Sequence, residues 1–375
     1  MHVYLCHFIR LIRPSLILLM AFGLPGTALA TSPNAEQWRH FNIRTVDHYI
    51  IPRYQNFAEE TATLEHAAQN FCQQTNGSNF SELQEAFKTS MLAWQSIQNV
   101  RFGPVETFMR IFAIQFWPDK KNHTEKQLRQ LINSEDPQRL SIDALHAASV
   151  SVRGLPALER MLFASNSETN LSEHAFQCRI VISISAYLAH NARNMVTEWR
   201  LDMRPQFAEK DPLDSYFEDD IDAATALIKV LVEPIEVIKD LKLKRVLGNS
   251  VEQVKPKRLE SWRSELSLRN LDANIHSLEA MFQGPEPGDG LAPLLDTSDR
   301  EKISTAFNEL KTTLAELSHL GSGDQTGILY YTLSSQEGYQ LASRLVSQLD
   351  ALHDMLETAV SELGIHLGFN SRDGD

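Results

Sequence analysis

The sequence is poor in cysteine and lacks the short motifs that mark common hydrolase and metal sites. Only three cysteines occur in 375 residues, and none belongs to a CxxC pair. There is no HExxH motif, so the zincin type of peptidase lacks its two histidines, and no GxSxG elbow supports a serine hydrolase. Alternating polar and apolar runs bounded by turns are also absent, so nothing in the sequence predicts a β-sheet.

Acidic residues outnumber basic residues in this sequence. The chain contains 48 Asp and Glu residues against 35 Lys and Arg residues, a formal net charge of −13 at pH 7. This negative charge argues against a nucleic-acid backbone as the main partner, because the phosphates would be repelled. A protein of this charge can still bind cations, although an acidic surface more often serves only to keep the protein soluble.

The N-terminus has an apolar run, Leu16 to Leu24, that is too short to span a bilayer. Arg10 and Arg13 precede it and Ala28-Leu29-Ala30 follows, which is the layout of a secretory signal at residues 1–30 with cleavage after Ala30. A single membrane anchor is the alternative. Cleavage predicts a soluble periplasmic chain without a transmembrane anchor, and loss of the two arginines makes its net charge −15.

Two cysteines remain after processing, since Cys6 leaves with the signal. Cys72 and Cys178 would then share an oxidising compartment, which predicts a disulfide that closes a loop of 106 residues. Two buried free thiols are the alternative. A two-cysteine metal site has less support, because no histidine lies at a suitable spacing.

Apolar residues recur at spacings of three and four, the period of one helix face. Three such stripes run from Leu83 to Trp94, from Ile303 to Leu317 and from Leu341 to Leu363. Ser298 with Glu301 fits a capping box at the start of the second stripe. The stripes predict an all-α fold in which they meet in bundle cores.

The mature length suggests two domains rather than one core. The segment RPQFAEKDPLD, within Met203 to Asp214, interrupts the helical pattern and predicts the boundary. We therefore expect one helical domain at residues 31–205 and another at residues 206–375.

Two segments, RFGPVE and RGLPALE, share a design. In each, a glycine ends one element, a proline can open the next helix, and a glutamate, Glu106 or Glu159, falls in the first turn. The helix dipole stabilises such a carboxylate by about 0.3 to 1 kcal/mol, which explains either glutamate without a ligand. The functional alternative is that the two helix starts, each preceded by an arginine, Arg101 or Arg153, converge on one pocket.

Further candidates lie in two other segments. Trp117, in FWPDKKN, either plugs a bundle end or lines a cleft. The polar stretch from Leu259 to Glu279 contains Glu260 and Arg263 beside apolar residues, and a solvated face is the default interpretation of such a run.

His276 and Glu279 are three residues apart, a spacing that can place an imidazole and a carboxylate on one metal. Two ligands do not complete a site, and a surface interaction between them is the alternative. His353 and Glu357, four residues apart, allow the same two interpretations.

Five segments occur in order over nearly all of the mature chain: WQSIQNVRFGPVE, IQFWPDKKN, RGLPALERMLF, LESWRSELSLRN and LGIHLGFNSRDGD. Together they resemble the imelysin family of exported bacterial proteins. The resemblance implies two helical bundles packed side by side, with a ligand cleft where they meet. It also implies a link to iron uptake, with iron or another divalent metal as the cofactor to expect.

The family's signature, GxHxxE, is incomplete in this chain. Gly154 and Glu159 match it, but Pro156 stands at the histidine position. Proline has no donor nitrogen, so the pair of ligands is reduced to one carboxylate. The resemblance therefore favours a binding or accessory protein for a metal, chelate or haem, with other iron-uptake envelope proteins as the expected partners. It places Glu106, Arg153, Glu159 and the Glu260 segment around one cavity. A metal-dependent peptidase and a protein-interaction module are the alternatives.

Overall fold

The computed structural model describes residues 32–208, 215–321 and 328–368. The predicted signal at residues 1–30 lies outside them, as do part of the predicted domain boundary and the end of the last motif. The described residues form helices and no β-strand, so the all-α prediction is confirmed. None of their helices is long and apolar enough to cross a membrane.

The first half of the chain contains ten α-helices among its described residues. They are α1 (Ala35–Thr45), α2 (Ile51–Gln73), α3 (Gly77–Gln95), α4 (Arg110–Ile114), α5 (His123–Ser134), α6 (Ile142–Ala147), α7 (Leu155–Leu162), α8 (Ser167–Glu173), α9 (Ala175–Glu198) and α10 (Arg204–Ala208). The second half contains α11 (Asp220–Glu236), α12 (Arg245–Leu247), α13 (Ser267–Gln283), α14 (Thr297–Leu320), α15 (Ile328–Thr332) and α16 (Gln336–Glu362).

Shorter helical segments of other pitch join or extend these helices. The π-helical segments are η1 (Val46–Ile50), η6 (Trp199–Met203) and η7 (Val237–Lys244), and each continues an α-helix directly. The 3₁₀ turns are η2 (Gly103–Val105), η3 (Thr107–Met109), η4 (Pro137–Leu140), η5 (Val150–Val152), η8 (Val251–Gln253), η9 (Pro256–Arg258) and η10 (Ala292–Leu294).

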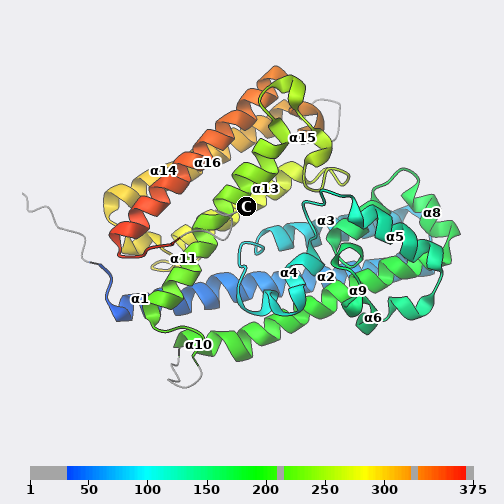
Figure 1. Cartoon of the computed structure of the whole chain (residues 1–375), viewed down its shortest axis with the longest axis horizontal. Helices are drawn as coiled ribbons and strands as arrows, with labels where there is room; N and C mark the ends of the chain where they lie inside the picture. Colours follow the sequence, from blue (N-terminus) through cyan, green and yellow to red (C-terminus); the bar gives the residue numbers. More distant parts are fainter. Residues whose placement is uncertain (1–31, 209–214, 322–327, 369–375) are drawn as a thin grey trace, which may run out of the picture.

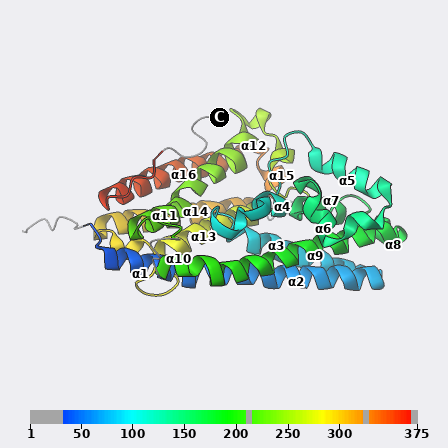
Figure 2. The same cartoon turned by 60° about the horizontal axis from the view of Figure 1, so that its bottom comes forward.

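The long helices form two bundles that lie side by side (Figure 1). In the first bundle α2 packs against α3 and α9, while the short helices α4 to α8 gather around them (Figures 1 and 2). In the second bundle α16 packs against α14 and α11, and α13 packs against α14. The bundles meet where α1 lies against α11 and where α3 lies against α13.

The three predicted apolar stripes face these cores. Every stripe position in α3 is buried, from Leu83 to Trp94, and so are those of α14 and of the α16 segment. The predicted start of α14 was wrong by two residues. Asp296, rather than Ser298, caps this helix by accepting a hydrogen bond from the backbone N–H of Asp299. An aspartate serves this role as well as a serine because its carboxylate can satisfy the same free donor.

The buried hydrophobic residues of the two bundles form one continuous cluster. Polar contacts also cross from the first helices to the second half of the chain. Arg39 in α1 pairs with Asp220 at 3.1 Å, and Asn42 donates to the Asp220 backbone oxygen at 2.8 Å. The division into domains at residues 205 and 206 stays a prediction.

A buried aspartate strengthens this junction. Asp289, in the turn after α13, is 1% exposed and is contacted by Arg44 and His48 from the N-terminal helices. Burial alone would raise the pKa of Asp289, but the hydrogen bonds and charges of Arg44 and His48 outweigh it and lower the pKa below its ordinary value.

The predicted disulfide is confirmed. Cys72, at the end of α2, is bonded to Cys178, at the start of α9, and their Cα atoms are 5.7 Å apart. The bond joins the two longest helices of the first bundle at one end. Because it closes a loop of 106 residues, it restricts the unfolded chain as well as the folded one.

Removing the disulfide should weaken the whole first bundle. We expect the Cys72→Ser, Cys178→Ser double variant to lose about 2 to 5 kcal/mol of unfolding free energy, the usual range for a native disulfide. Urea denaturation followed by circular dichroism measures the loss. Wild-type protein treated with reductant is the matched control, and an unchanged urea midpoint in both would contradict the expectation.

The lowered pKa of Asp289 predicts a loss of stability in acid. A carboxyl whose folded pKa is below its unfolded pKa stabilises the protein above the ordinary aspartate value, roughly 3.9. That contribution disappears as the pH falls through the folded pKa. We expect Asp289→Asn to be less stable than wild type near neutrality, with the difference shrinking between roughly pH 5 and pH 3. Urea unfolding across this range tests it, and a constant difference would show that Asp289 acts without its charge.

Candidate functional site between the bundles

The predicted metal pair of α13 is divided between separate contacts. His276 is exposed and its ring lies 3.2 Å from Asp272, whereas the carboxylate of Glu279 accepts a hydrogen bond from Lys311 of α14 at 2.7 Å. Both residues therefore have partners within the protein in the described structure.

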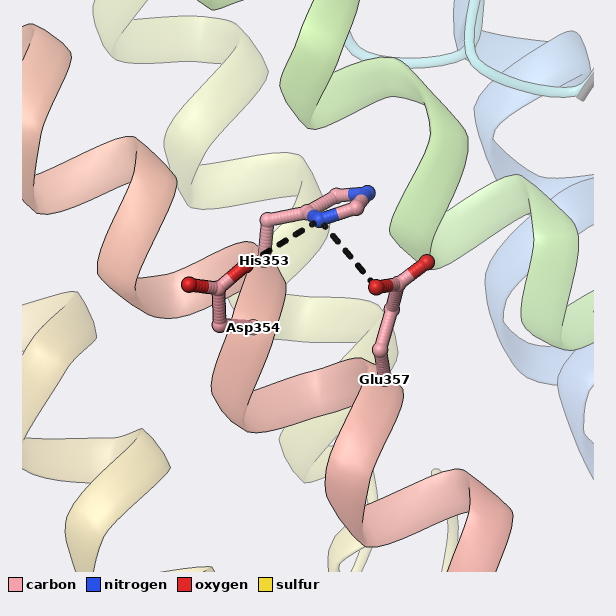
Figure 3. Close-up of side chains that lie close together, drawn as sticks. All are labelled: His353, Asp354 and Glu357. Carbon is pink, nitrogen blue, oxygen red and sulfur yellow. Dashed lines mark ion pairs between the residues drawn. The ribbon is translucent and has the colours of Figure 1, made fainter.

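Two other groups of donors lie closer together among the described residues. In the first, His353 of α16 faces Asp354 and Glu357, with its Nδ1 atom 3.9 Å and 3.7 Å from their carboxylates (Figure 3). The second consists of Asp296, Asp299 and Glu362. The carboxylate side chains of the first group are mostly in solvent, and Asp299 of the second already pairs with Lys302. Exposed acidic groups of this kind do not by themselves indicate a metal.

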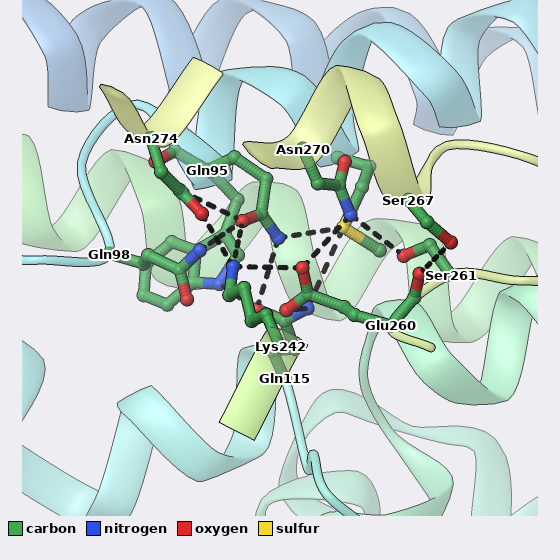
Figure 4. A network of polar contacts seen from close by, with 11 residues as sticks. Gln95, Gln98, Gln115, Lys242, Glu260, Ser261, Ser267, Asn270 and Asn274 are labelled. Carbon is green, nitrogen blue, oxygen red and sulfur yellow. Dashed lines mark hydrogen bonds and ion pairs between the residues drawn. The ribbon is translucent and has the colours of Figure 1, made fainter. Parts of the chain in front are cut away.

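A buried polar layer lies where α3, η7 and α13 meet, with Lys242 at its centre (Figure 4). The ammonium of Lys242 donates to Gln95 Oε1 at 2.8 Å, Glu260 Oε2 at 2.9 Å and Asn274 Oδ1 at 2.6 Å. An ammonium has three N–H groups, so all of its donors have acceptors. Lys242 thus joins the first bundle, through Gln95, to the second.

Glu260 is the anionic member of this polar layer and pairs with Lys242. Its carboxylate also accepts hydrogen bonds from Gln115 Nε2 at 2.9 Å and Asn270 Nδ2 at 3.1 Å. Glu260 and Lys242 are each 4% exposed, so the ion pair is withdrawn from water. The default of a solvated face for Leu259 to Glu279 was therefore wrong at several of its polar positions, although Glu265, Asp272 and His276 are exposed. Glu260, Ser264, Asn270 and Asn274 are all buried.

The charge of Lys242 depends on these partners. Burial lowers the pKa of Lys242, and the nearby Arg101 lowers it further, while the Glu260 carboxylate raises it. Because three oxygens surround the nitrogen, we interpret the side chain as an ion-paired ammonium that holds the bundles together.

Sequence reasoning missed Lys242 and its amide partner Gln95. Their contacts join residues 147 positions apart, so no local pattern reports them. One signal was available. Lys242 occupies a helix face whose other members, Ile235, Ile238 and Val246, are almost fully buried. A lysine within an apolar stripe indicates either an ion pair or a functional group.

The RGLPALE segment forms a helix start, as predicted, but Glu159 does not belong to its first turn. The helix α7 begins at Leu155 with Pro156 in the first turn, which makes Glu159 the fifth residue. Gly154 is required here because a Cβ atom would lie 2.4 Å from the backbone oxygen of Ala113. The other glutamate, Glu106, follows a single 3₁₀ turn, η2, rather than opening an α-helix.

Glu159 binds the protein's own backbone. Its Oε1 atom accepts hydrogen bonds from the N–H groups of Arg263 and Ser264 at 3.1 Å and 3.0 Å, and from the Ser264 hydroxyl at 2.8 Å. Burial raises the pKa of Glu159, although these donors and the Arg263 charge oppose the shift. The carboxylate ties α7 to the polar segment that leads from Glu260 into α13.

The remaining candidates lie apart from one another. Arg153 is buried and donates to the backbone oxygens of Leu145 and His146, so it closes the end of α6 rather than pairing with Glu159. Glu106 is exposed, and Trp117 is half-buried. Of the predicted ligand-binding residues, the structure brings together Glu159 and Arg263, and it places Glu260 in the neighbouring polar layer.

A cavity of about 220 Å³ lies beside the polar layer, between the end of α3 and the α11–η7 helix. Gln95, Lys242 and Asn274 belong to both the layer and the cavity wall. The rest of the lining is both apolar and polar. Its apolar part is Phe102, Ala226, Val230, Pro234, Val237, Ile238 and Leu278, and its other polar members are Gln98, Asn99, Arg101, Lys229, Glu233, Glu236 and Ser277.

The proline in α11 explains how the cavity wall is built. Pro234 has no N–H, so it cannot donate to the carbonyl of Val230, four residues earlier. Asn99, which comes from the first bundle, donates to that carbonyl at 3.2 Å. The π-helical segment η7 follows directly, and such wide turns are frequent at functional sites. The Oδ1 atom of Asn99, a residue of the cavity wall, is buried without a hydrogen-bond partner in the described structure.

The Lys242–Glu260 pair can be tested by a double-mutant cycle. Lys242→Met leaves Glu260 as a buried charge without its cation, which we expect to cost about 3 to 5 kcal/mol of unfolding free energy. Lys242→Met combined with Glu260→Gln should cost less than the two single changes added together. Urea unfolding of the four proteins gives the coupling, and strictly additive losses would contradict it.

The contribution of Glu159 to stability can be tested with two single substitutions. We expect Glu159→Ala to lose about 1 to 3 kcal/mol, because the buried N–H of Ser264 and the part-buried N–H of Arg263 lose their acceptor. The Ser264 hydroxyl can still donate to the backbone oxygen of Ser261. Glu159→Gln keeps an oxygen at that place and removes the buried charge, so its loss should be smaller. Urea unfolding near neutral pH compares them, and equal losses would mean that the negative charge itself is needed.

Known proteins resemble this chain in sequence and in fold. Iron-regulated protein A of Synechococcus elongatus (strain ATCC 33912 / PCC 7942 / FACHB-805) is 23% identical over 252 residues, covering 66% of this chain and 64% of that relative's length. An imelysin-like protein from Psychrobacter arcticum 273-4 has a similar crystal structure, with a TM-score of 0.72 and 21% identity over 91% of this chain and 99% of that one.

A second solved structure, described as a "putative iron-regulated protein A precursor" from Parabacteroides distasonis ATCC 8503, has a TM-score of 0.70 at 13% identity, covering 88% of this chain and 96% of that one. At these identities the two structures establish the fold. The sequence model of the imelysin family matches residues 50–356, which is most of the chain. The protein therefore belongs to the imelysin family.

Proposed function

We propose that this protein is a periplasmic binding or accessory protein in iron acquisition that holds a small ligand in the cavity between its two bundles. The observation that carries the proposal is the cavity itself, which adjoins a buried ion pair and is lined by both polar and apolar side chains from the two bundles. The iron-regulated relative and the secretory layout of the first thirty residues support the iron link and the export.

The lining favours an organic ligand over a bare metal ion. The wall contains the cationic side chains of Arg101, Lys229 and Lys242, of which Lys242 is already paired with Glu260. It also contains the carboxylates of Glu233 and Glu236, and no histidine or cysteine. The wall therefore lacks the imidazole and thiolate ligands that transition-metal sites use, whereas its cations and amides can bind the anionic oxygens of an organic ligand. Apolar walls such as Phe102 and Leu278 would contact the carbon skeleton of such a ligand.

Size restricts the ligand further. A volume of about 220 Å³ is below the range of roughly 300 to 1,000 Å³ that is usual for sites of drug-sized molecules. We therefore favour a small chelating acid, free or carrying iron, over a whole haem.

Direct metal binding through Glu159 is the alternative within the same function. Pro156 removes the imidazole of the family signature, and Oε1 of Glu159 already accepts three hydrogen bonds. A metal-dependent peptidase would need about three protein ligands and a general base around an activated water. No feature of the described residues favours that arrangement over the binding function.

The proposal is tested by calorimetry on the mature protein, Thr31 to Asp375, with ferric citrate, a ferric catecholate, citrate alone, Fe(II), Fe(III) and haem. Ala226 lines the cavity from α11, and Ala226→Trp should fill it. We expect a small chelate to bind wild type and to bind the variant roughly tenfold or more weakly, a loss of about 1.4 kcal/mol.

Ala226→Ser is the matched control, since it changes the same position without filling the space. Binding of chelates equally by wild type and Ala226→Trp would remove the cavity from the proposal. Stoichiometric binding of bare iron that is lost in both Glu159→Ala and Glu159→Gln would favour the metal alternative instead.

A further inference from the structure

Positive charge is concentrated in one short stretch of an acidic protein. Residues 239–263 contain eight Lys and Arg residues and three Asp and Glu residues, whereas the chain as a whole has a net charge of −13. Three of these cations have carboxylate partners: Lys239 with Asp350, Lys242 with Glu260, and Lys244 with Asp240. The other five cations are Arg245, Lys255, Lys257, Arg258 and Arg263.

These five form what we call the basic ridge, which runs from α12 through η9 to the start of the polar segment. Lys255, Lys257 and Arg258 are exposed, and Arg245 and Arg263 are half-buried. None of the five charged groups has a carboxylate oxygen within 4.0 Å among the described residues, although Arg263 is close enough to Glu159 and Glu125 to interact with their charges. Arg258 donates to the backbone oxygen of Arg245 at 3.4 Å, which holds two like charges together. Their mutual repulsion costs free energy that an external anion would relieve.

Three aromatic residues lie against the ridge. The guanidinium of Arg263 is 4.2 Å from the centre of the Trp262 ring, and the ammonium of Lys257 approaches the same ring at 5.9 Å. Trp262 lies 5.8 Å from Tyr330 of α15, which contacts Tyr331 at 4.9 Å between ring centres. Tyr331 is 60% exposed. The helices α12 and α15 lie on the same side of the molecule in Figure 2.

We propose that the basic ridge and these aromatic rings bind the surface of a membrane that contains anionic phospholipids. Lys and Arg clusters are attracted to anionic headgroups, and Trp and Tyr side chains prefer the interface between headgroups and hydrocarbon. The cations of the ridge would contact the headgroups, and the aromatic rings would lie at the boundary between the headgroups and the hydrocarbon. This surface is separate from the cavity, so the inference does not depend on the proposed ligand.

The charge distribution favours a membrane over a long soluble polyanion. A flexible polyanion would extend over the acidic remainder of the protein and be repelled by it. A membrane touches one face, and charges further away than the Debye length, about 8 Å at physiological salt, contribute little. The exposed acids nearest the ridge in sequence are Glu252 and Glu265, and Glu125 and Glu159 lie beside Arg263, together fewer than its five cations.

Vesicle sedimentation of the mature protein tests the proposal. We expect binding to vesicles of phosphatidylcholine mixed with phosphatidylglycerol, little binding to phosphatidylcholine alone, and loss of binding at high ionic strength. Lys257→Glu with Arg258→Glu should weaken binding by roughly tenfold or more, because each cation near an anionic surface contributes severalfold to the partition coefficient. Tyr331→Ser should weaken binding to vesicles without changing the charge.

The matched control is Arg179→Glu with Arg200→Glu, which reverses two exposed cations on α9 and η6. We expect it to bind as wild type does, and circular dichroism confirms that each variant is folded. Equal binding to both kinds of vesicle, no binding, or an equal loss in the control would overturn the proposal. A single-stranded oligonucleotide that binds the ridge as tightly as the anionic vesicles, and is unaffected by Tyr331→Ser, would identify a general polyanion site and would also overturn it.

Discussion

The buried ion pair between Lys242 and Glu260 is the contact on which the arrangement of the two bundles depends. Each charge lies at a place where burial alone would be unfavourable, so both require the amide groups around them. Gln95 and Gln115 come from the first bundle, whereas Asn270 and Asn274 come from the second. The ion pair is therefore satisfied only when the bundles dock in one register, and hydrophobic contact alone would not select that register.

Irregular helices bring the required groups to this junction. Pro234 interrupts the hydrogen bonding of α11, and the π-helical segment that follows contains Lys242. The π-helical segment η1 contains Tyr49, whose hydroxyl meets Ser277 at 2.7 Å and accepts a hydrogen bond from Asn99 at 2.8 Å. Asn99 also satisfies the carbonyl that Pro234 leaves free. The helix defects and the contacts between bundles thus form one connected system beside the cavity.

In the incomplete family signature, the remaining Glu159 has a structural role. Without the histidine, the Glu159 carboxylate still has hydrogen-bond donors, which are Ser264 and the backbone N–H of Arg263. The residue connects α7 with the segment that begins at Glu260. At this position the carboxylate holds two parts of the protein together through hydrogen bonds, and Glu159 does not line the cavity beside the polar layer.

Much of the architecture is determined by the sequence alone. The apolar stripes of α3, α14 and α16 are local, with a period of three to four residues, and they specify buried helix faces wherever the chain goes. The cysteine pair and the family motifs are likewise readable without coordinates. Only the tertiary structure decided which polar residues became a site. Lys242 and Gln95 meet across 147 residues, and Glu159 and Ser264 across 105. A polar side chain has the same local pattern whether it faces water or a buried partner, and the docking of the bundles settles which of the two it meets.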